Sequence, residues 1–545
     1  MNSLVISAIG IFLFLIAYRF YAGYLERLWG VNPDEKTPAY KNRDGVDYIP
    51  VKHWSILFGH HFASIAGAGP IIGPVIAGVI WGWGPAVLWI VFGSILLGGV
   101  HDFSALMVSI RHNGKSIGDV SSSVIGRRAK IIFSIFLWFT LVLVVAVFAA
   151  VTAKTFIEEP KIVIPTFSLI IIAILFGFLV YRLNFPQIYA TIISLLLYVL
   201  LFIIGSRFSI VIHSKDAMKI WIIILLSYSF IASVMPVNLL LQPRDYLSSF
   251  ILFFGLLFGY IGLIITHPQV HTPAFISFSS SKGPLWPMMF VIIACGAISG
   301  FHSLVSSGTT SKQINNEKYA KNIGYGAMLT EGVLSILALM CVSAGLYWTK
   351  QNPSLSYPVL MKGGNWIGTF AKGYGQITAP IFGAAAGTMA AMVMINSFVL
   401  TTLDTATRIT RYISQELFGD TWKIKIFKNR FFATFFIIIF AGYLAFGNWK
   451  KIWPVFGASN QLVAAIVLLV GGTYLAKKGK NSKILFLPSI FMFLTTLFAL
   501  LIQAKEFYLK KNFLLGNIAS ILILLALFLI IETILKIKSE KYKKT

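Results

Sequence analysis

Two acidic residues lie in long apolar stretches of the kind that cross lipid bilayers. Glu331 is near the middle of 321–349, and Asp404 is deep within 376–407. A charge at the centre of a bilayer costs at least ~3 kcal/mol, so such residues usually carry function. Reversible proton carriage is the first interpretation. A neutral Glu331 making one structural hydrogen bond and an i,i+4 salt bridge from Asp404 to Arg408 are the alternatives.

Hydroxyl groups accompany these carboxylates. Thr405 follows Asp404 directly, and Ser306 and Ser307 lie in the polar segment 300–310. Oxygen atoms beside a carboxylate are ligands that hard cations prefer. The sequence therefore predicts that these hydroxyls take part in a coupling-ion site. An ordinary polar helix end is the alternative for 300–310.

Four histidines, His60, His61, His101 and His302, lie in apolar surroundings, and Asp102 follows His101 directly. Adjacent helical residues project about 100° apart, so His60 and His61 do not easily bind one metal ion. No Glu-x-x-His or His-Glu-x-x-His pattern accompanies them, and no metal is expected. His60, His61 and His302 are predicted to contact substrate or relay protons. Asp102 is a further candidate for the coupling charge.

One guanidinium and two amides lie together in 235–246. Arg244 is a natural partner for a substrate carboxylate, because guanidinium binds carboxylate through two hydrogen bonds. Asn238 and Gln242 add neutral polar groups. The sequence predicts that these three residues bind substrate. Pairing of Arg244 with Asp245 is the alternative.

Glycine and proline interrupt three apolar stretches, at 67–74, 235–246 and 300–310. In transporters, helix breaks near the midplane free backbone groups to face a cavity. Gly67 and Gly69 are therefore predicted to line a substrate site, with a kinked, close-packed helix as the alternative. The first two breaks lie five spans apart, which favours an inverted five-helix repeat.

The composition indicates an integral membrane protein. The 545 residues are 57% hydrophobic and 12% charged, with a mean hydropathy of +0.81, and soluble proteins carry about twice that charged fraction. The net charge of +26 resides in short loops between apolar runs, which indicates topology rather than nucleic-acid binding. Cys295 and Cys341 lie in apolar stretches and indicate neither a disulfide framework nor a zinc cluster.

We expect an all-α polytopic protein with about fifteen spanning helices, since each needs about 20 mostly apolar residues. The predicted spans are 2–22, 54–81, 85–110, 129–155, 162–181, 187–206, 218–240, 246–267, 286–307, 321–349, 376–407, 430–447, 451–476, 484–503 and 513–536. Alternate loops are rich in Lys and Arg, which predicts an outside N-terminus and an inside C-terminus. The segment 286–307 is either a span or re-entrant.

The chain is expected to form one transmembrane domain, 1–545. Its parts are an N-terminal helix and inside loop (1–53), a core (54–476), and two C-terminal helices with a basic tail (477–545). No loop is long enough for an ATP-hydrolysing domain, and no complete phosphate-binding loop is present. We expect no cofactor. Uphill transport would draw on a gradient of H⁺ or Na⁺, or on a partner chain.

Eight ordered runs resemble the carbon starvation protein A (CstA) family. They are Asp47-Tyr48-Ile49-Pro50, Phe58-Gly59-His60-His61-Phe62, Gly67-Ala68-Gly69-Pro70, Leu241-Gln242-Pro243-Arg244-Asp245-Tyr246, Ser299-Gly300-Phe301-His302-Ser303, Ser307-Gly308-Thr309-Thr310, Thr402-Leu403-Asp404-Thr405-Ala406-Thr407-Arg408 and Phe456-Gly457-Ala458-Ser459-Asn460-Gln461. The resemblance implies a cell-membrane carrier for peptides, or for pyruvate by proton symport, during nutrient starvation. It also implies a LeuT-like or amino acid–polyamine–organocation-like core. The sequence departs from the family at His101, where Gln is common.

The residues and the resemblance together predict a secondary transporter rather than an enzyme. Its expected partners are a peptide or pyruvate substrate, H⁺ or Na⁺, and the lipid bilayer. The alternatives are a channel or facilitator for small carboxylates, and a membrane protein that senses a solute.

Overall fold

A computed structural model describes residues 2–349, 352–362, 364–447 and 449–542. The first helices are α1 (Ser3–Trp29), α2 (Pro38–Lys41), α3 (Trp54–Ile65), α4 (Gly69–Trp81), α5 (Trp83–Gly93), α6 (Gly99–Arg111), α7 (Ile117–Val124), α8 (Arg127–Glu158), α9 (Val163–Gly177), α10 (Gln187–Arg207) and α11 (Ala217–Val234). The remaining helices are α12 (Leu241–Thr266), α13 (Leu285–Ile292), α14 (Gly300–Gly308), α15 (Ala327–Gly345), α16 (Tyr357–Lys362), α17 (Trp366–Phe382), α18 (Ala384–Ser414), α19 (Arg430–Phe446), α20 (Trp449–Lys477), α21 (Lys483–Leu509) and α22 (Phe513–Tyr542). Two short antiparallel strands, β1 (Ser279–Ser280) and β2 (Gly283–Pro284), precede α13.

Twelve helices in the described ranges are long and apolar enough to cross a membrane, and the bent pair α3 and α4 raises the number to 13. The predicted fifteen spans are thus not confirmed. Two of the fifteen predicted spans are not among these 13. The first, 430–447, corresponds to α19, which has only 17 residues. The second is the predicted span 286–307, which the structure divides between α13 and α14.

The first interruption separates α3 from α4, which are bent by 42°. The non-helical residues are Ala66–Ala68, so this break begins one residue before the predicted segment 67–74. Pro70 lies in the first turn of α4, where a missing N–H breaks no helical hydrogen bond. Pro74 is accommodated inside α4.

The other interruptions differ from the sequence prediction. Residues 235–240 connect two separate helices, α11 and α12, rather than breaking one span. In the third stretch the non-helical part is 293–299, and Gly300 begins helix α14 instead of ending one. The predicted span 376–407 is divided at Gly383, whose φ of 83° is left-handed and separates α17 from α18.

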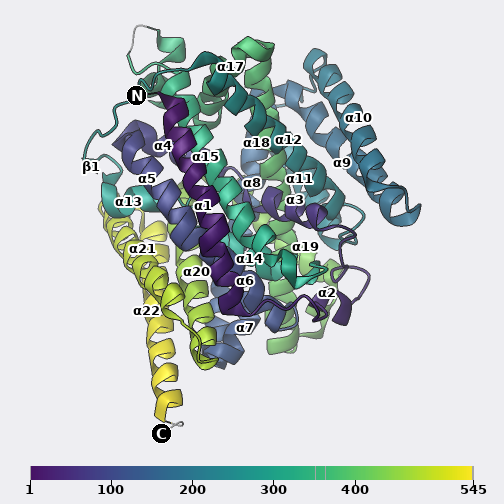
Figure 1. Ribbon diagram of the computed structural model, residues 1–545, viewed down its shortest axis with the longest axis vertical. Helices are drawn as coiled ribbons and strands as arrows, with labels where there is room; N and C mark the ends of the chain where they lie inside the picture. The colour runs from purple at the N-terminus through teal and green to yellow at the C-terminus, as the bar shows by residue number, and fades with distance from the viewer. Residues whose placement is uncertain (1, 350–351, 363, 448, 543–545) are drawn as a thin grey trace.

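The helices pack around two long central ones, α8 and α18, which contact each other. Helix α12 packs along α3, and α15 packs along α4. Figure 1 shows α9 and α10 as a pair on one flank and α21 and α22 on the opposite flank, with the two ends of the chain at opposite ends of the bundle. The broken helices therefore lie in the interior of the bundle, between α6, α12, α15 and α18.

Close packing at Gly300 gives a test of this arrangement. A Cβ on Gly300 would overlap the carbonyl oxygen of Asn460 and lie 2.5 Å from the Cβ of Val463. We expect Gly300→Ala to lower stability by about 1–3 kcal/mol, because backbone and β-branched atoms of α20 cannot yield. The measurement is thermal unfolding of the purified protein in detergent. Gly23→Ala is the matched control, since no atom lies within 4 Å of its added Cβ. Equal midpoints for the two variants would contradict the packing of α14 on α20.

Candidate functional site

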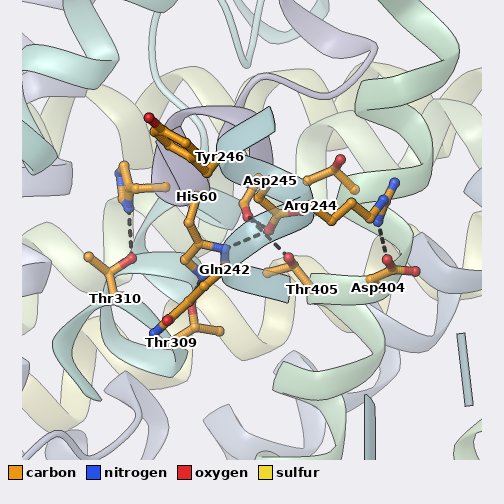
Figure 2. A network of polar contacts seen from close by, with 12 residues as sticks. His60, Gln242, Arg244, Asp245, Tyr246, Thr309, Thr310, Asp404 and Thr405 are labelled. Atoms are coloured by element: carbon orange, nitrogen blue, oxygen red, sulfur yellow. Dashed lines mark hydrogen bonds and ion pairs between the residues drawn. The ribbon is translucent and has the colours of Figure 1, made fainter. Parts of the chain in front are cut away.

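A network centred on His60 joins α3 to α12 and to the turn after α14. The imidazole Nδ1 lies 2.5 Å from Asp245 Oδ2, and Nε2 lies 2.9 Å from Thr309 Oγ1. Figure 2 shows His60 among Gln242, Asp245 and Thr309. His60 and Asp245 are fully buried. A buried carboxylate needs a partner of this kind, because an unpaired charge in the interior is very costly.

Amide side chains extend the same network. The Gln313 Nε2 atom lies 3.3 Å from His60 Nε2, and Gln242 donates to Gln313 Oε1 at 2.8 Å. Tyr181, which follows α9, donates to Gln242 Oε1 at 2.7 Å. Gln242 therefore lies in the same network as His60, as a substrate site formed by both residues would require. Its amide already has protein partners.

Hydroxyls line the other side of Asp245. Ser64 Oγ lies 3.4 Å from Asp245 Oδ2 and 3.1 Å from Thr405 Oγ1. Thr402 donates to the backbone carbonyl of Ser64 at 3.2 Å. Asp245 Oδ1 is buried without a hydrogen-bond partner in the described structure. Thr405 is thus connected through Ser64 to Asp245, which lies on another helix, although Thr405 follows Asp404 in the sequence.

Arg244 and Asp404 form a second buried unit. The guanidinium pairs with Asp404 Oδ2, which also accepts a 2.6 Å hydrogen bond from Tyr228. The Arg244 guanidinium also donates to the carbonyls of Ser397 and Leu400 at 3.4 Å. Figure 2 shows Arg244 reaching toward Asp404 and away from His60. In this conformation the guanidinium is occupied by protein groups.

Both salt bridges considered as alternatives for these residues are replaced by pairings with residues far away in the sequence. Asp245 contacts His60 instead of Arg244. Arg408 pairs with Asp47 at 2.7 Å instead of with Asp404. Arg411 also binds Asp47, at 2.8 and 3.0 Å. Burial alone would raise the pKa of Asp47, but Arg411 and Arg408 hold that pKa below its ordinary value.

His61 belongs to a separate network on the other side of α3. Its Nε2 lies 3.0 Å from Asp102 Oδ2, and its Nδ1 lies 2.8 Å from Thr310 Oγ1. Ser306 donates to the second oxygen of Asp102. The predicted residues His61, Asp102 and Ser306 are thus brought together. Thr310 was not singled out in the sequence.

His302 lies between two acids in this second network. Its Nε2 is 3.2 Å from Glu331 Oε2, and its Nδ1 is 3.9 Å from Asp102 Oδ2. Neither pair is aligned for a hydrogen bond, and all three side chains are fully buried. His61, Asp102, His302 and Glu331 therefore form a continuous row of titratable groups from α3 to α15.

The remaining predicted residues lie apart from these hydrogen-bond networks. A Cβ on Gly67 would lie 2.9 Å from Thr402 Oγ1, and one on Gly69 would overlap the side chain of Cys295. Asn238 is half-buried in the connection between α11 and α12. Ser307 accepts the backbone N–H of Ile117 at 3.2 Å and so ties α14 to α7.

Several residues in the networks could be found only from the structure. Asp245 and Asp47 lie in family-like runs, but nothing local identifies their partners. Tyr228 lies in an ordinary apolar helix. Within the described residues, no group of three or more His, Cys, Asp or Glu side chains is placed to hold a metal ion.

Comparison with solved structures defines the class of protein. The fold resembles that of a manganese transporter from Eremococcus coleocola, with a TM-score of 0.52 and 14% identity, covering 91% of this chain and 99% of that one. At this identity the likeness concerns the fold alone. The protein is a multi-pass helical membrane protein with a transporter fold.

The sequence comparisons identify the family. The model of the family described as carbon starvation protein CstA matches residues 2–358 and 356–499, and the chain belongs to this family. A peptide transporter CstA from Campylobacter jejuni is 32% identical over 91% of this chain and 79% of the relative. The peptide transporter CstA of Bacillus subtilis is 31% identical, covering 100% of this chain and 98% of the relative. The pyruvate/proton symporter BtsT of Escherichia coli is 30% identical over 92% and 81%. The resemblance seen in the sequence is thus confirmed.

The Arg244–Asp404 pair predicts a strong effect on stability. We expect Arg244→Gln to cost about 3–5 kcal/mol, because it leaves a buried carboxylate without its charged partner. Adding Asp404→Asn should recover part of that loss. Both are measured by thermal or denaturant unfolding in detergent. Lys219→Gln is the control, since its ion pair with Asp216 is solvent-exposed. A loss for Arg244→Gln no larger than the control's would contradict the buried pair.

Proposed function

We propose that this protein imports small carboxylate-bearing solutes, peptides or pyruvate, by proton symport under nutrient starvation. Its family membership and its relatives' names support this substrate class. The observation that carries the proposal is the row from His61 to Glu331, buried beside two interrupted helices. Interrupted helices supply backbone groups for a substrate, and the row supplies titratable groups for coupling.

We also infer an inverted five-helix repeat. The first repeat would comprise α3 with α4, α5 with α6, α8, α11 and α12. The second would comprise α13 with α14, α15, α18, α19 and α20. Reciprocal packing supports this assignment, because α4 contacts α15 while α14 contacts α6. Likewise α8 contacts α18 and α11 contacts α19.

In this arrangement α9 and α10 are an inserted pair outside the repeat. Their position on one flank of the bundle in Figure 1 agrees with this inference. The second broken helix is then the pair α13 and α14, in place of the predicted break at 235–246. The division into a core of 54–476 and an added part of 477–545 fits the same scheme, since both repeats end before α21.

The substrate would bind between the two breaks. Gly69 packs against Cys295, and a Cβ on Gly73 would lie 2.7 Å from the carbonyl oxygen of Ile292. The helices α4 and α14 begin at these breaks, and helix N-termini favour anions. A carboxylate is common to pyruvate and to the C-terminus of a peptide. Gly67, beside Thr402, lies at the same place.

Glu331 is the coupling residue that we favour. Among the residues that the structure describes, only His302 lies within ion-pair distance of its carboxylate, so gain or loss of a proton is not opposed by other bonds. Asp404 is the second candidate, but it is held by Arg244 and Tyr228. A proton on Glu331 would neutralise its carboxylate and weaken its attraction to His302, which would then be attracted mainly to Asp102. Because His302 is on α14 and Glu331 is on α15, protonation would affect how these two helices pack.

The orientation that we propose is an outside N-terminus and an inside C-terminus in the cell membrane. The basic loops support it, because they alternate along the chain as topology signals do. The two ends of the chain lie at opposite ends of the bundle in Figure 1, as an odd number of crossings requires.

Uptake into proteoliposomes tests the function directly. We expect accumulation of labelled pyruvate or of a labelled dipeptide above equilibrium when an inward proton gradient is imposed. A sodium gradient at constant pH should not replace it. Uptake that reaches equilibrium without accumulation would indicate a facilitator. Absence of uptake, with solute binding retained, would indicate a sensor.

Glu331→Gln tests the coupling residue. We expect the variant to lose at least about tenfold of its gradient-driven accumulation, because a neutral amide carries no proton. Exchange of internal for external substrate at equal pH should remain, since it needs no net proton movement. Glu158→Gln is the control, because this glutamate is exposed at the end of α8. Full coupled accumulation by Glu331→Gln would remove Glu331 from the mechanism and leave Asp404 to be tested.

A further inference from the structure

A basic cavity lies at the end of the bundle where α18 finishes, far along this helix from Asp404. Its volume is about 350 Å³, within the range of small-molecule sites. The lining residues are Asp44, Val46, Asp47, Tyr48, Lys312, Arg411, Tyr412, Gln415, Lys428 and Arg430. Nothing in the proposed transport mechanism uses this cavity.

The two carboxylates that line the cavity already have partners in the protein. Asp44 Oδ1 accepts the backbone N–H groups of Val46, Asp47 and Tyr48 at 2.8, 2.8 and 2.9 Å. Asp47 is bound by Arg408 and Arg411. Four cationic side chains line the cavity against these two carboxylates. The cavity therefore has an excess of two positive charges.

Lys312 is the most unusual of the four cations. It is only 4% exposed, and no carboxylate of the described residues lies within ion-pair distance of its ammonium, although the charges of Glu416, Asp47 and Asp44 act on it. Its ammonium lies 3.4 Å from the centroid of the Tyr412 ring and 5.5 Å from that of Tyr48. Cation–π contacts offset only part of the cost of burying an ammonium group. A ligand with negative charge would supply the missing partner.

The two cations at the rim remain accessible. Lys428 is 62% exposed on its side chain, and its ammonium lies 3.5 Å from the equally exposed carboxylate of Asp420. Such surface pairs contribute little and exchange easily. Arg430 begins the apolar helix α19, at the same end of the bundle as the cavity. We expect both a soluble anion and a lipid headgroup to reach this rim.

We propose that this cavity binds a phosphate group, carried either by a soluble organic phosphate or by an anionic lipid headgroup. A phosphate monoester carries about −1.5 to −2 charges, which matches the excess of two positive charges. Its oxygens accept the parallel N–H groups of a guanidinium such as that of Arg411. Lys312 is the buried contact, and Lys428 and Arg430 attract the ligand at the rim.

The turn that carries Lys312 connects this cavity to the polar interior. Thr309 contacts His60 and Thr310 contacts His61, three and two residues before Lys312 in the chain. Arg411 lines the cavity and also binds Asp47. A bound phosphate would therefore contact both the turn that binds the two histidines and the loop that carries Asp47.

Binding to the purified full-length chain tests the proposal. Sodium phosphate is titrated by calorimetry against sodium chloride at equal ionic strength. We expect Lys312→Gln to weaken phosphate binding about tenfold, and Lys428→Gln about threefold. Lys425→Gln is the matched control, because this exposed lysine shares a helical turn with Lys428 but does not line the cavity. If Lys312→Gln does not fold, Lys428→Gln and Arg430→Gln decide the result.

The pH dependence gives a second readout. Burial lowers the pKa of Lys312 to about 8, against the opposing fields of Glu416, Asp47 and Asp44 and with the support of Arg411. The ammonium charge is therefore lost as the pH rises from 7 to 9. Relative to Lys312→Gln, the unmodified protein should lose phosphate affinity severalfold over that range. The comparison with the variant is needed because phosphate also loses its second proton as the pH rises, and this change affects both proteins alike.

Nanodiscs distinguish the two sources of phosphate. One set contains phosphatidylcholine alone, and the other also contains phosphatidic acid, whose headgroup is a phosphate monoester. Retention of phosphatidic acid that falls in Lys312→Gln but not in Lys425→Gln supports the lipid source, and binding of free phosphate without such retention supports the soluble one. The proposal is overturned if neither arm separates Lys312→Gln and Lys428→Gln from Lys425→Gln. Equal affinity for pyruvate at the same ionic strength would also overturn it, because the cavity would then be a general carboxylate vestibule. None of these measurements depends on transport.

Discussion

Two adjacent histidines constrain the polar interior of this protein. His60 contacts Thr309 and His61 contacts Thr310, so consecutive residues of one helix are tied to consecutive residues of one turn. Each contact belongs to a buried network, and a half-satisfied polar network in a low-dielectric interior is costly. Helix α3 and the turn after α14 must therefore keep one register. The pairing of Asp245 on one side and of Asp102 on the other depends on it.

The bilayer explains why the charged groups pair across helices. A helix in lipid satisfies its own backbone, but a charged side chain must find its partner on another helix or reach water. Arg244 pairs with Asp404 and Arg408 with Asp47, although Asp245 and Asp404 are nearer to these arginines in sequence. The spacing in the sequence favours an i,i+4 pair between Asp404 and Arg408. The packing of α12 against α18 decides the partner of Arg244, and the loop before α3 supplies the partner of Arg408.

The class of structure can be predicted from the sequence, but only part of the candidate site can. Composition indicates a membrane protein, and Gly67, Gly69 and Pro70 indicate the first break to within a residue. The non-helical stretch 293–299 contains one glycine and no proline, so its local sequence gives little sign of a break, and it packs closely against α4. Residue type alone makes His60, His61, Asp102 and Glu331 candidates, and the structure places them in its buried polar networks, whereas a partner such as Tyr228 has no local signal.

Helix α18 links the interior to the end of the bundle. Asp404, Arg408 and Arg411 follow at helical spacing, so about 10 Å separates the first from the last along the axis. Asp404 is bound to α12, while Arg408 and Arg411 are bound to Asp47 in the loop that precedes α3. A helix is stiff over this length, and a displacement of α18 that separates Asp404 from Arg244 also moves both arginines. A displacement of α18 would therefore change the polar interior and the end of the bundle together, and the loop with Asp47 would connect it to α3 and its two histidines.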